Sequence, residues 1–395
     1  MPETEAKDKE TVSAIVPTFN RSALLAECLD SLLSQTRPPD QILVVDDGST
    51  DNTAEIVSRY APAVSYVRKE NGGKSSALNL ALSMVTGDYV WICDDDDIAA
   101  AGGLEAMMRG FAENPSVAYV FGDYRSFQVD DTGEKIFSDP DYRRRHEEPN
   151  LKINFLEGMF ILQFACLVRR EVYVALGNFE EQLIRSQDYD MMLRLSQAYA
   201  GAYVPEIIFY YREHEAERGS ESTVFDASES VDKWLAYDRI IFERLLADLP
   251  LDDFTPTFAI GQPNGQRAAL IQRAVIFGKR AFWEVAAEDL GAAERLGDDK
   301  LTMEESQLLY SVIHQPEIWR TLELDDAAIN KLSEIYGRSD LGREIVSDFL
   351  RPTVWIIRDS ITSGNLAAVR QFWSILFKIA GVGTPGVILR RPNAA

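Results

Sequence analysis

The sequence has few cysteines and few histidines. Among 395 residues there are three of each, and Cys28, Cys93 and Cys166 lie far apart along the chain. Such sparse sulfur and imidazole groups give no basis for a disulfide framework or a zinc cluster, so we expect a reducing compartment. The first ten residues are largely charged and lack the apolar region of a signal peptide.

Long hydrophobic runs and excess positive charge are also missing. No stretch approaches the roughly 20 apolar residues of a membrane-spanning helix. Lys and Arg together number 40 against 63 Asp and Glu, which gives a net charge of −23. Because nucleic-acid binding needs a basic surface that neutralises phosphates, we expect no nucleic-acid partner. These features predict a cytoplasmic protein.

The composition supports full-sized hydrophobic cores. Apolar residues make up 46% of the chain and aromatic residues 10%, and this length suits two domains. We expect a disordered N-terminus at residues 1–10, an α/β domain at 11–225 and an all-helical C-terminal domain at 226–395. A polar, acidic segment at 213–232 marks the predicted linker, and helical spacing alone follows it.

Short apolar runs alternate with helical periods in the first hundred residues. The runs at 11–18, 41–46, 64–68 and 89–93 read as strands. Apolar strands that alternate with helices predict a parallel sheet covered on both faces. Ligands of such sheets bind beyond the carboxyl ends of the strands. Polar residues occur at these ends, at 17–20, 46–49, 71–74 and 94–97, so we expect them to converge on one site.

The fourth predicted strand ends in four consecutive carboxylates, Asp94, Asp95, Asp96 and Asp97, which we call the acid cluster. These side chains repel one another unless a cation lies among them, and oxygen ligands suit Mg²⁺ or Mn²⁺. Alternate residues of an extended chain face the same way, so Asp94 and Asp96 address one site and Asp95 points elsewhere. A solvated acidic turn is the structural alternative.

Several linked motifs occur in order over residues 11–215. They are VSAIVPTFNRS at 12–22, VVDDGSTD at 44–51, NGGKSSALN at 71–79, the acid cluster, QDYDMMLRL at 187–195 and YYREH at 210–214. Together they resemble the inverting family 2 glycosyltransferases. The resemblance implies a GT-A fold, which is a Rossmann-like, mostly parallel sheet with helices on both faces. It also implies transfer of a sugar from a nucleotide-sugar donor, with UDP-sugars favoured, to an acceptor hydroxyl, aided by Mn²⁺ or Mg²⁺.

The resemblance also assigns site residues. Asp188 is the predicted catalytic base, although the family usually has Glu-Asp where this chain has Gln187-Asp188. A helix-capping role is the alternative for Asp188, a solvated side chain for Lys74 and a structural role for His214. The predicted metal ligands are Asp96, Asp97 and His214, and the predicted donor contacts are Pro17, Thr18, Asn20, Asp46, Asp47, Asn71, Lys74, Asp94 and Asp95.

Other functions are weighed against this one. A nucleotidyltransferase would carry a Gly-rich basic loop after its first strand, and a polymerising synthase would carry transmembrane helices. The non-enzyme alternative is a nucleotide-sugar-binding or scaffold protein that keeps the GT-A fold. The acceptor is expected in polysaccharide, glycolipid or glycoprotein synthesis.

The last thirty residues combine basic and aromatic side chains. From Asn365 onward the chain has no acidic residue, but it contains Arg370, Phe372 and Trp373. We favour a core helix here. The alternative is a peripheral contact with the inner face of an anionic membrane, or with a protein partner, through the helical domain.

Overall fold

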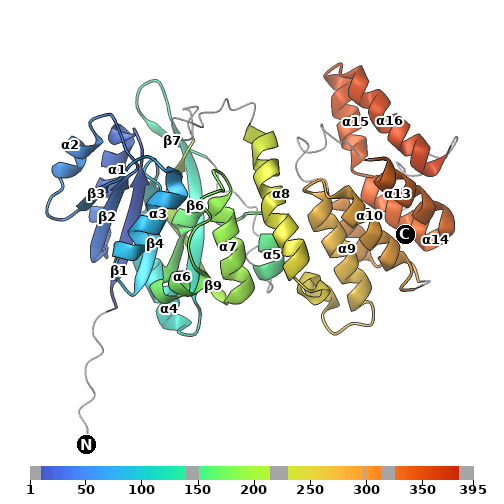
Figure 1. The fold of residues 1–395 in the computed structure, drawn as a ribbon, viewed down its shortest axis with the longest axis horizontal. Coiled ribbons are helices and arrows are strands. Elements are labelled where there is room, and N and C mark those ends of the chain that lie inside the picture. The colour runs from blue at the N-terminus through green and yellow to red at the C-terminus, as the bar shows by residue number, and fades with distance from the viewer. Residues whose placement is uncertain (1–9, 139–150, 214–229, 298, 313–324, 382–395) are drawn as a thin grey trace, which may run out of the picture. The chain divides into compact units, whose positions relative to one another are not determined.

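The computed structural model describes residues 10–138, 151–213, 230–297, 299–312 and 325–381. The chain divides into two compact units, with the boundary between Ser230 and Val231. The first unit is a sheet with helices, and the second unit is helical (Figure 1).

The first unit contains a nine-stranded sheet, and the four strands predicted from the sequence form one side of it. β1, β2, β3 and β4 pair in parallel, which confirms the expected parallel arrangement. Beyond β4 the sheet is mixed, since β8 runs antiparallel to β4 and β6. The order is β3 (Ser65–Arg68), β2 (Gln41–Asp46), β1 (Val12–Thr18), β4 (Tyr89–Ile92), β8 (Cys166–Arg169), β6 (Tyr119–Val129), β9 (Gly201–Arg212) and β5 (Ile98–Ala99), with β7 (Lys135–Phe137) paired to β6.

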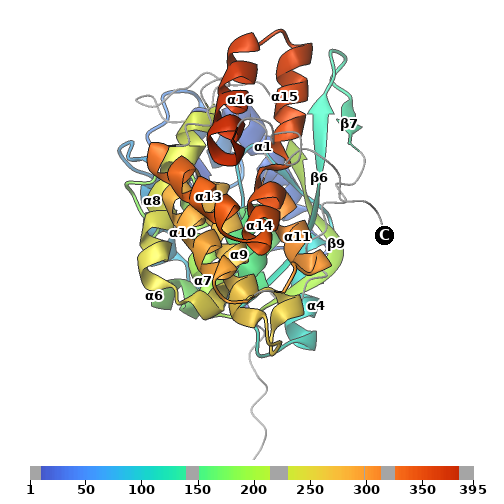
Figure 2. The same cartoon turned by 90° about the vertical axis from the view of Figure 1, so that its right-hand side faces the viewer.

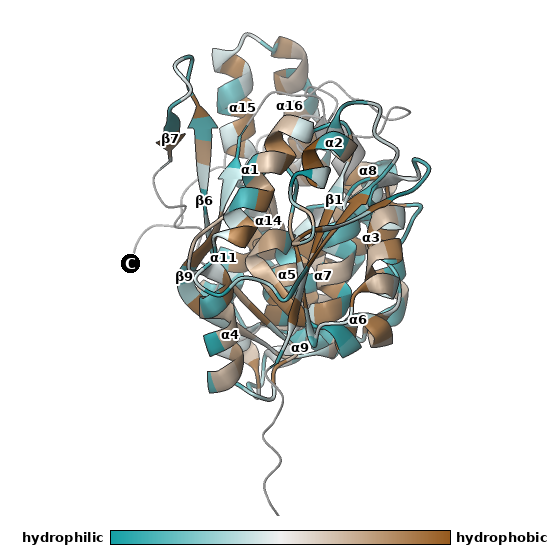
Figure 3. Ribbon diagram, turned by 90° about the vertical axis from the view of Figure 1, so that its left-hand side faces the viewer, coloured by the Kyte–Doolittle hydropathy of each residue, from teal (hydrophilic) through white to brown (hydrophobic). Residues whose placement is uncertain are grey.

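Helices cover both faces of the sheet and bury its central strands. All residues of β1 and β4 are buried, and the strands around β1 are largely brown in the hydropathy colouring of Figure 3. The helices are α1 (Ser22–Leu33), α2 (Thr53–Ser58), α3 (Gly73–Met84), α4 (Gly103–Glu113), α5 (Leu151–Glu157), α6 (Arg170–Leu176) and α7 (Gln187–Ala198), with a 3₁₀ turn η1 (Gln163–Ala165). The predicted α/β class is confirmed.

The topology places a switch point at the carboxyl end of β1. The chain passes from β1 to β2 and β3 on one side and then returns to place β4 on the other side. Ligands bind at such switch points in open α/β sheets. Pro17 lies beyond the last β1–β4 pair, Ile15 with Ile92, where its missing N–H is tolerated.

The second unit contains only helices in the ranges that the structure describes. They are α8 (Ser230–Asp248), η3 (Leu251–Phe254), η4 (Thr257–Ala259), α9 (Gly265–Gly278), α10 (Trp283–Glu294), α11 (Met303–Tyr310), α13 (Asp326–Arg338), α14 (Asp340–Leu350), α15 (Thr353–Thr362) and α16 (Leu366–Ala380) (Figure 2). The predicted core helix near the C-terminus is confirmed, because α16 buries Phe372, Ile375, Leu376 and Ile379 in the core of this unit. Among the described residues no helix has the length and apolar character needed to cross a membrane.

Candidate active site

The acid cluster alternates between buried and half-exposed side chains. Asp94 and Asp96 are half-exposed, whereas Asp95 is 4% and Asp97 2% exposed. The cluster lies beyond the end of β4 in a turn closed by the hydrogen bond from the Asp97 N–H to the Asp94 carbonyl at 3.3 Å, so the alternation comes from this turn and not from an extended strand. Asp94 and Asp96 are therefore the two carboxylates that a ligand at this end of the sheet can reach.

The two buried carboxylates are bound by neighbouring strands. Thr18 Oγ1 donates to Asp95 Oδ2 at 2.7 Å, and the backbone N–H of Arg212 donates to Asp97 Oδ1 at 2.8 Å. Burial raises the pKa of Asp95 to about 6, and the charge of Asp96 adds to this while Arg21 opposes it. Burial, with the charges of Asp96 and Asp94, raises the pKa of Asp97 to about 9. The hydrogen bond between Asp97 and the Arg212 backbone joins the cluster to the end of β9.

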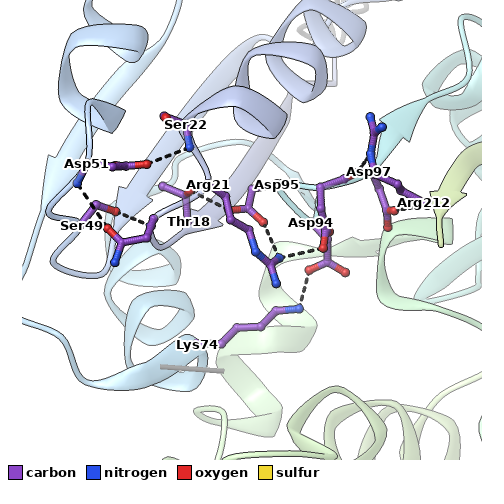
Figure 4. Close-up of polar contacts among 12 residues, drawn as sticks. Thr18, Arg21, Ser22, Ser49, Asp51, Lys74, Asp94, Asp95, Asp97 and Arg212 are labelled. Atoms are coloured by element: carbon purple, nitrogen blue, oxygen red, sulfur yellow. Dashed lines mark hydrogen bonds and ion pairs between the residues drawn. The ribbon is translucent and has the colours of Figure 1, made fainter. Parts of the chain in front are cut away.

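Each half-exposed carboxylate carries one cation, as Figure 4 shows for Asp94. Lys74 Nζ contacts Asp94, and Arg21 Nη1 contacts Asp96 Oδ2 at 2.7 Å and Asp95 Oδ1 at 3.1 Å. Burial lowers the pKa of Lys74, but the charges of Asp94 and Asp188 outweigh it and raise that pKa above its ordinary value. Lys74 is therefore charged in this site and is not a solvated surface lysine. Arg21 was missed by the sequence reasoning, although a cation directly after Asn20 in the first motif was a usable signal.

Asp188 lies at the start of α7 and joins the same electrostatic group. Its side chain is half-buried, and burial raises its pKa, with Lys74 opposing and Asp94 reinforcing that shift. Its Oδ1 accepts the backbone N–H of Tyr189 at 2.9 Å. The residue before the helix, Ser186, has a left-handed φ of 59°, a conformation that costs energy outside glycine and is frequent at functional sites.

Contacts of the two residues after Asp188 fix the first turn of α7. The Tyr189 hydroxyl donates to the Phe155 carbonyl at 2.7 Å. Asp190 is fully buried and accepts Arg194 Nε at 2.9 Å, while Arg194 also donates to the carbonyls of Leu176 and Asn178. The position of Asp188 is therefore set by packing and by a buried ion pair, and not by a flexible loop.

The end of β2 forms a second polar group beside the acid cluster. Asp46 is 1% exposed; its Oδ1 accepts the Ser49 N–H at 2.8 Å and its Oδ2 accepts the hydroxyl of Tyr66 from β3. Arg68 Nε lies 3.8 Å from the same oxygen. Tyr66 and Arg68, which the sequence reasoning also missed, share one face of β3 because they are two positions apart.

Three predicted donor contacts hold loops together in the structure. Asp47 accepts Lys69 Nζ and the backbone N–H groups of Gly72 and Gly73 at 2.7 to 2.9 Å. Asn20 Oδ1 accepts the Thr50 N–H at 2.7 Å, and Asn71 Nδ2 donates to the Asp47 carbonyl at 2.8 Å. A donor contact for these residues stays a prediction, while their loop-fixing contacts are observed.

Gly48 allows the loop at 71–74 to pack closely against the end of β2. Its φ is +89°, and a Cβ there would lie 2.9 Å from the Asn71 nitrogen. A side chain at this position would therefore be strained and would push the 71–74 loop away from the end of β2.

The structure thus brings most predicted residues to one edge of the sheet. Thr18, Lys74, Asp188 and the acid cluster form one interacting group, and Pro17, Asn20, Asp46, Asp47 and Asn71 lie at the neighbouring strand and helix ends. His214 lies outside the described residues, so its predicted metal contact is not addressed.

The reachable carboxylates fit a hard divalent ion by chemistry. Within the described ranges no three His, Cys, Asp or Glu side chains gather as a preformed metal site. Mg²⁺ is commonly held by one or two carboxylates, with waters and substrate phosphates completing its shell. Asp94 and Asp96 supply that number of oxygen ligands, and a bound diphosphate would supply the others.

Comparisons with known proteins agree with this arrangement. Residues 13–177 match the family model described as glycosyl transferase family 2. An uncharacterized glycosyltransferase of Rickettsia typhi is 29% identical over 212 residues, which are 52% of this chain and 65% of that protein. Chondroitin synthase of Pasteurella multocida is 30% identical over 192 residues, which are 47% of this chain but only 19% of that protein.

A solved structure shares the fold. TarS residues 1–349 of S. aureus, in complex with UDP-GlcNAc, aligns with a TM-score of 0.51 at 17% identity and covers 90% of this chain and 92% of that one. At this identity the likeness concerns the fold alone. Residues 13–177 are therefore similar to the family 2 glycosyltransferases, and the architecture of the first unit agrees with a GT-A fold.

Proposed function

We propose that this protein transfers a sugar from a nucleoside diphosphate sugar to an acceptor hydroxyl, with inversion at the anomeric carbon. One observation carries the proposal. Two reachable carboxylates (Asp94 and Asp96), two cations (Arg21 and Lys74) and an elevated-pKa carboxylate (Asp188) form one electrostatic group at the switch point of the sheet.

The leaving diphosphate develops negative charge as the glycosidic bond breaks. A divalent ion held by Asp96 and Asp94 would stabilise that charge as a Lewis acid. The carboxyl end of β2, with Asp46 and its partner Tyr66, lies one strand from this group and suits the nucleoside part of the donor. His214 and Asp97 remain predicted supporting ligands.

Inversion requires one base that removes the acceptor hydroxyl's proton during in-line attack. Asp188 suits this role, because burial raises its pKa and so makes it a better proton acceptor than a solvated aspartate. The anchored first turn of α7 holds the carboxylate in place, which lowers the entropic cost of reaching the reactive geometry.

The relatives support the substrate class. The aligned TarS structure contains UDP-GlcNAc, which favours a UDP-sugar donor. Chondroitin synthase is a polysaccharide-forming relative, which favours a carbohydrate-containing acceptor. A cytoplasmic site of action, with the second unit contacting a protein partner or the membrane surface, completes the proposal.

A thermal-shift panel tests the proposed donor and metal. We expect one of UDP, GDP, dTDP and CMP, with UDP favoured, to stabilise the protein when Mn²⁺ is present. A ligand at about 100 times its Kd contributes about 2.7 kcal/mol to the free energy of unfolding. The stabilisation should disappear in Asp96→Ala, because the metal loses one of its two reachable carboxylate ligands. No stabilisation by any nucleotide would contradict the proposed donor binding.

A further inference from the structure

We propose that Lys74 and Arg21 are exchangeable counter-ions. They neutralise Asp94 and Asp96 in the free protein, and turn to the donor's diphosphate once a divalent ion takes those two carboxylates. The inference rests on the proposed function and adds to it a role for two cations that sit where the metal is expected.

The pairing is one cation to one reachable carboxylate. Lys74 and Asp94 have side chains 30% and 31% exposed, and Arg21 and Asp96 have side chains 25% and 14% exposed. Ion pairs that reach water contribute little net stability, about 0–1 kcal/mol. This range applies to the Lys74–Asp94 pair, whereas Arg21 also contacts the buried Asp95 at 3.1 Å. A divalent ion with twice the charge therefore displaces Lys74 from Asp94 at small cost.

Asp47 takes two of the N–H groups at the start of α3, those of Gly72 and Gly73. Helix N-termini ordinarily offer such N–H groups to anions. Lys74 is the next residue, and its ammonium sits on a flexible four-carbon stem that reaches alternative partners without backbone movement. The Lys74 side chain therefore adds a cationic phosphate contact at a helix start that has lost two of its N–H groups to Asp47.

Arg21 is the N-cap residue of α1. It precedes Ser22, the first residue of that helix, and contacts Asp96 Oδ2 at 2.7 Å. A guanidinium binds carboxylate and phosphate with the same fork geometry, so Arg21 can exchange one for the other.

The charge balance makes the two binding events depend on each other. The acid cluster and Asp188 contribute negative charge that would repel a free diphosphate. Arg21 and Lys74 are already paired with carboxylates of the cluster. A divalent ion releases both cations, and each then favours the anion. Metal and nucleotide should therefore strengthen each other's binding, and by linkage the factor is the same in both directions.

Lys74→Met distinguishes this exchange from a structural role of Lys74. In this variant the proposal predicts tighter binding of Mn²⁺ and weaker binding of UDP. Without its competitor, the protein should bind Mn²⁺ alone about two- to fivefold more tightly, from the usual strength of a partly exposed ion pair. Its affinity for UDP in saturating Mn²⁺ should fall about tenfold or more, because a charged hydrogen bond to phosphate is lost. Free Mn²⁺ is counted by electron paramagnetic resonance, and UDP binding is measured by calorimetry.

Two further variants define the controls. Lys74→Arg keeps the charge and should restore both affinities toward wild type. Arg59→Met removes one positive charge from an exposed pair with Glu55 on α2 and should change neither affinity.

Each outcome is decisive. Unchanged or weaker Mn²⁺ binding by Lys74→Met overturns the exchange, and unchanged UDP binding overturns the contact with the diphosphate. Both results require that wild type binds UDP with Mn²⁺. If wild type binds no nucleoside diphosphate, the proposed function itself fails, so the two failures are distinguishable.

Discussion

Replacing Asp188 by asparagine is expected to lower kcat by about 10²- to 10⁴-fold, the usual contribution of a positioned general base. The affinity for UDP with Mn²⁺ should stay close to that of wild type. Asparagine keeps the shape of the side chain and can still accept the Tyr189 N–H that Asp188 accepts at 2.9 Å, but it cannot remove a proton. Steady-state transfer assays and UDP calorimetry on the same preparation measure the two effects.

The matched control is Glu180→Gln. This change also removes one carboxylate ahead of α7, but Glu180 is exposed and lies outside the electrostatic group. Its kcat should be unchanged. An Asp188→Asn variant that retains wild-type turnover would remove Asp188 from the chemistry, and nucleotide binding without turnover in wild type would favour the non-catalytic binding protein.

The pH dependence of wild type gives a second readout of the same residue. A general base works only when it is ionised, so kcat falls as the pH drops through its pKa. Because burial raises the pKa of Asp188, this decline should begin at a higher pH than a solvated aspartate, with a pKa of about 3.9, would give. The residual activity of Asp188→Asn should lack that decline. An acid limb that persists in the variant would assign it to another group.

The part of the site that the sequence predicts well is the part fixed by strand periodicity. Apolar runs located β1, β2, β3 and β4, and their carboxyl ends then located the polar groups. Period-two alternation predicted that Asp95 points away from Asp94 and Asp96, but the cluster forms a turn, and Asp95, although buried, shares Arg21 with Asp96.

What the sequence could not resolve are pairings across large sequence separations. Arg21 meets Asp96, and Tyr66 meets Asp46, only after the sheet has formed, so neither pairing is visible from the neighbours of these residues in the chain. Motif membership also did not reveal the loop contacts of Asp47 with Gly72 and Gly73, and its donor contact stays a prediction.

Helix α15 shows the same limit in the second unit. Its sequence, TVWIIRDSIT, is rich in β-branched residues with low helix propensity, so local preference does not favour a helix there. Ile356 and Ile357 are buried in the helical core. Tertiary packing therefore decides this segment against its local preference, as is common for short helices.

Glu305→Gln is expected to destabilise the second unit by about 3–5 kcal/mol, the cost of leaving a buried charge without its partner. Glu305 is fully buried, and its two oxygens accept Arg267 Nε at 2.9 Å and Nη2 at 2.7 Å, which joins α9 to α11. Arg267, 7% exposed, would keep its charge in the variant and lose the opposing one. Glu304→Gln is the matched control, since its exposed side chain is the adjacent carboxylate.

The same variant tests whether the two units fold as separate domains. Urea unfolding is followed with and without UDP and Mn²⁺, because the ligands stabilise only the unit that binds them. If the second unit is an independent domain, Glu305→Gln should lower the midpoint of a transition that the ligands do not shift, and UDP affinity at low urea should stay unchanged. A single transition that both the substitution and the ligands shift would show that the units unfold together. That result would contradict an independent helical domain, and would mean that the helical unit contributes directly to the stability of the transferase site.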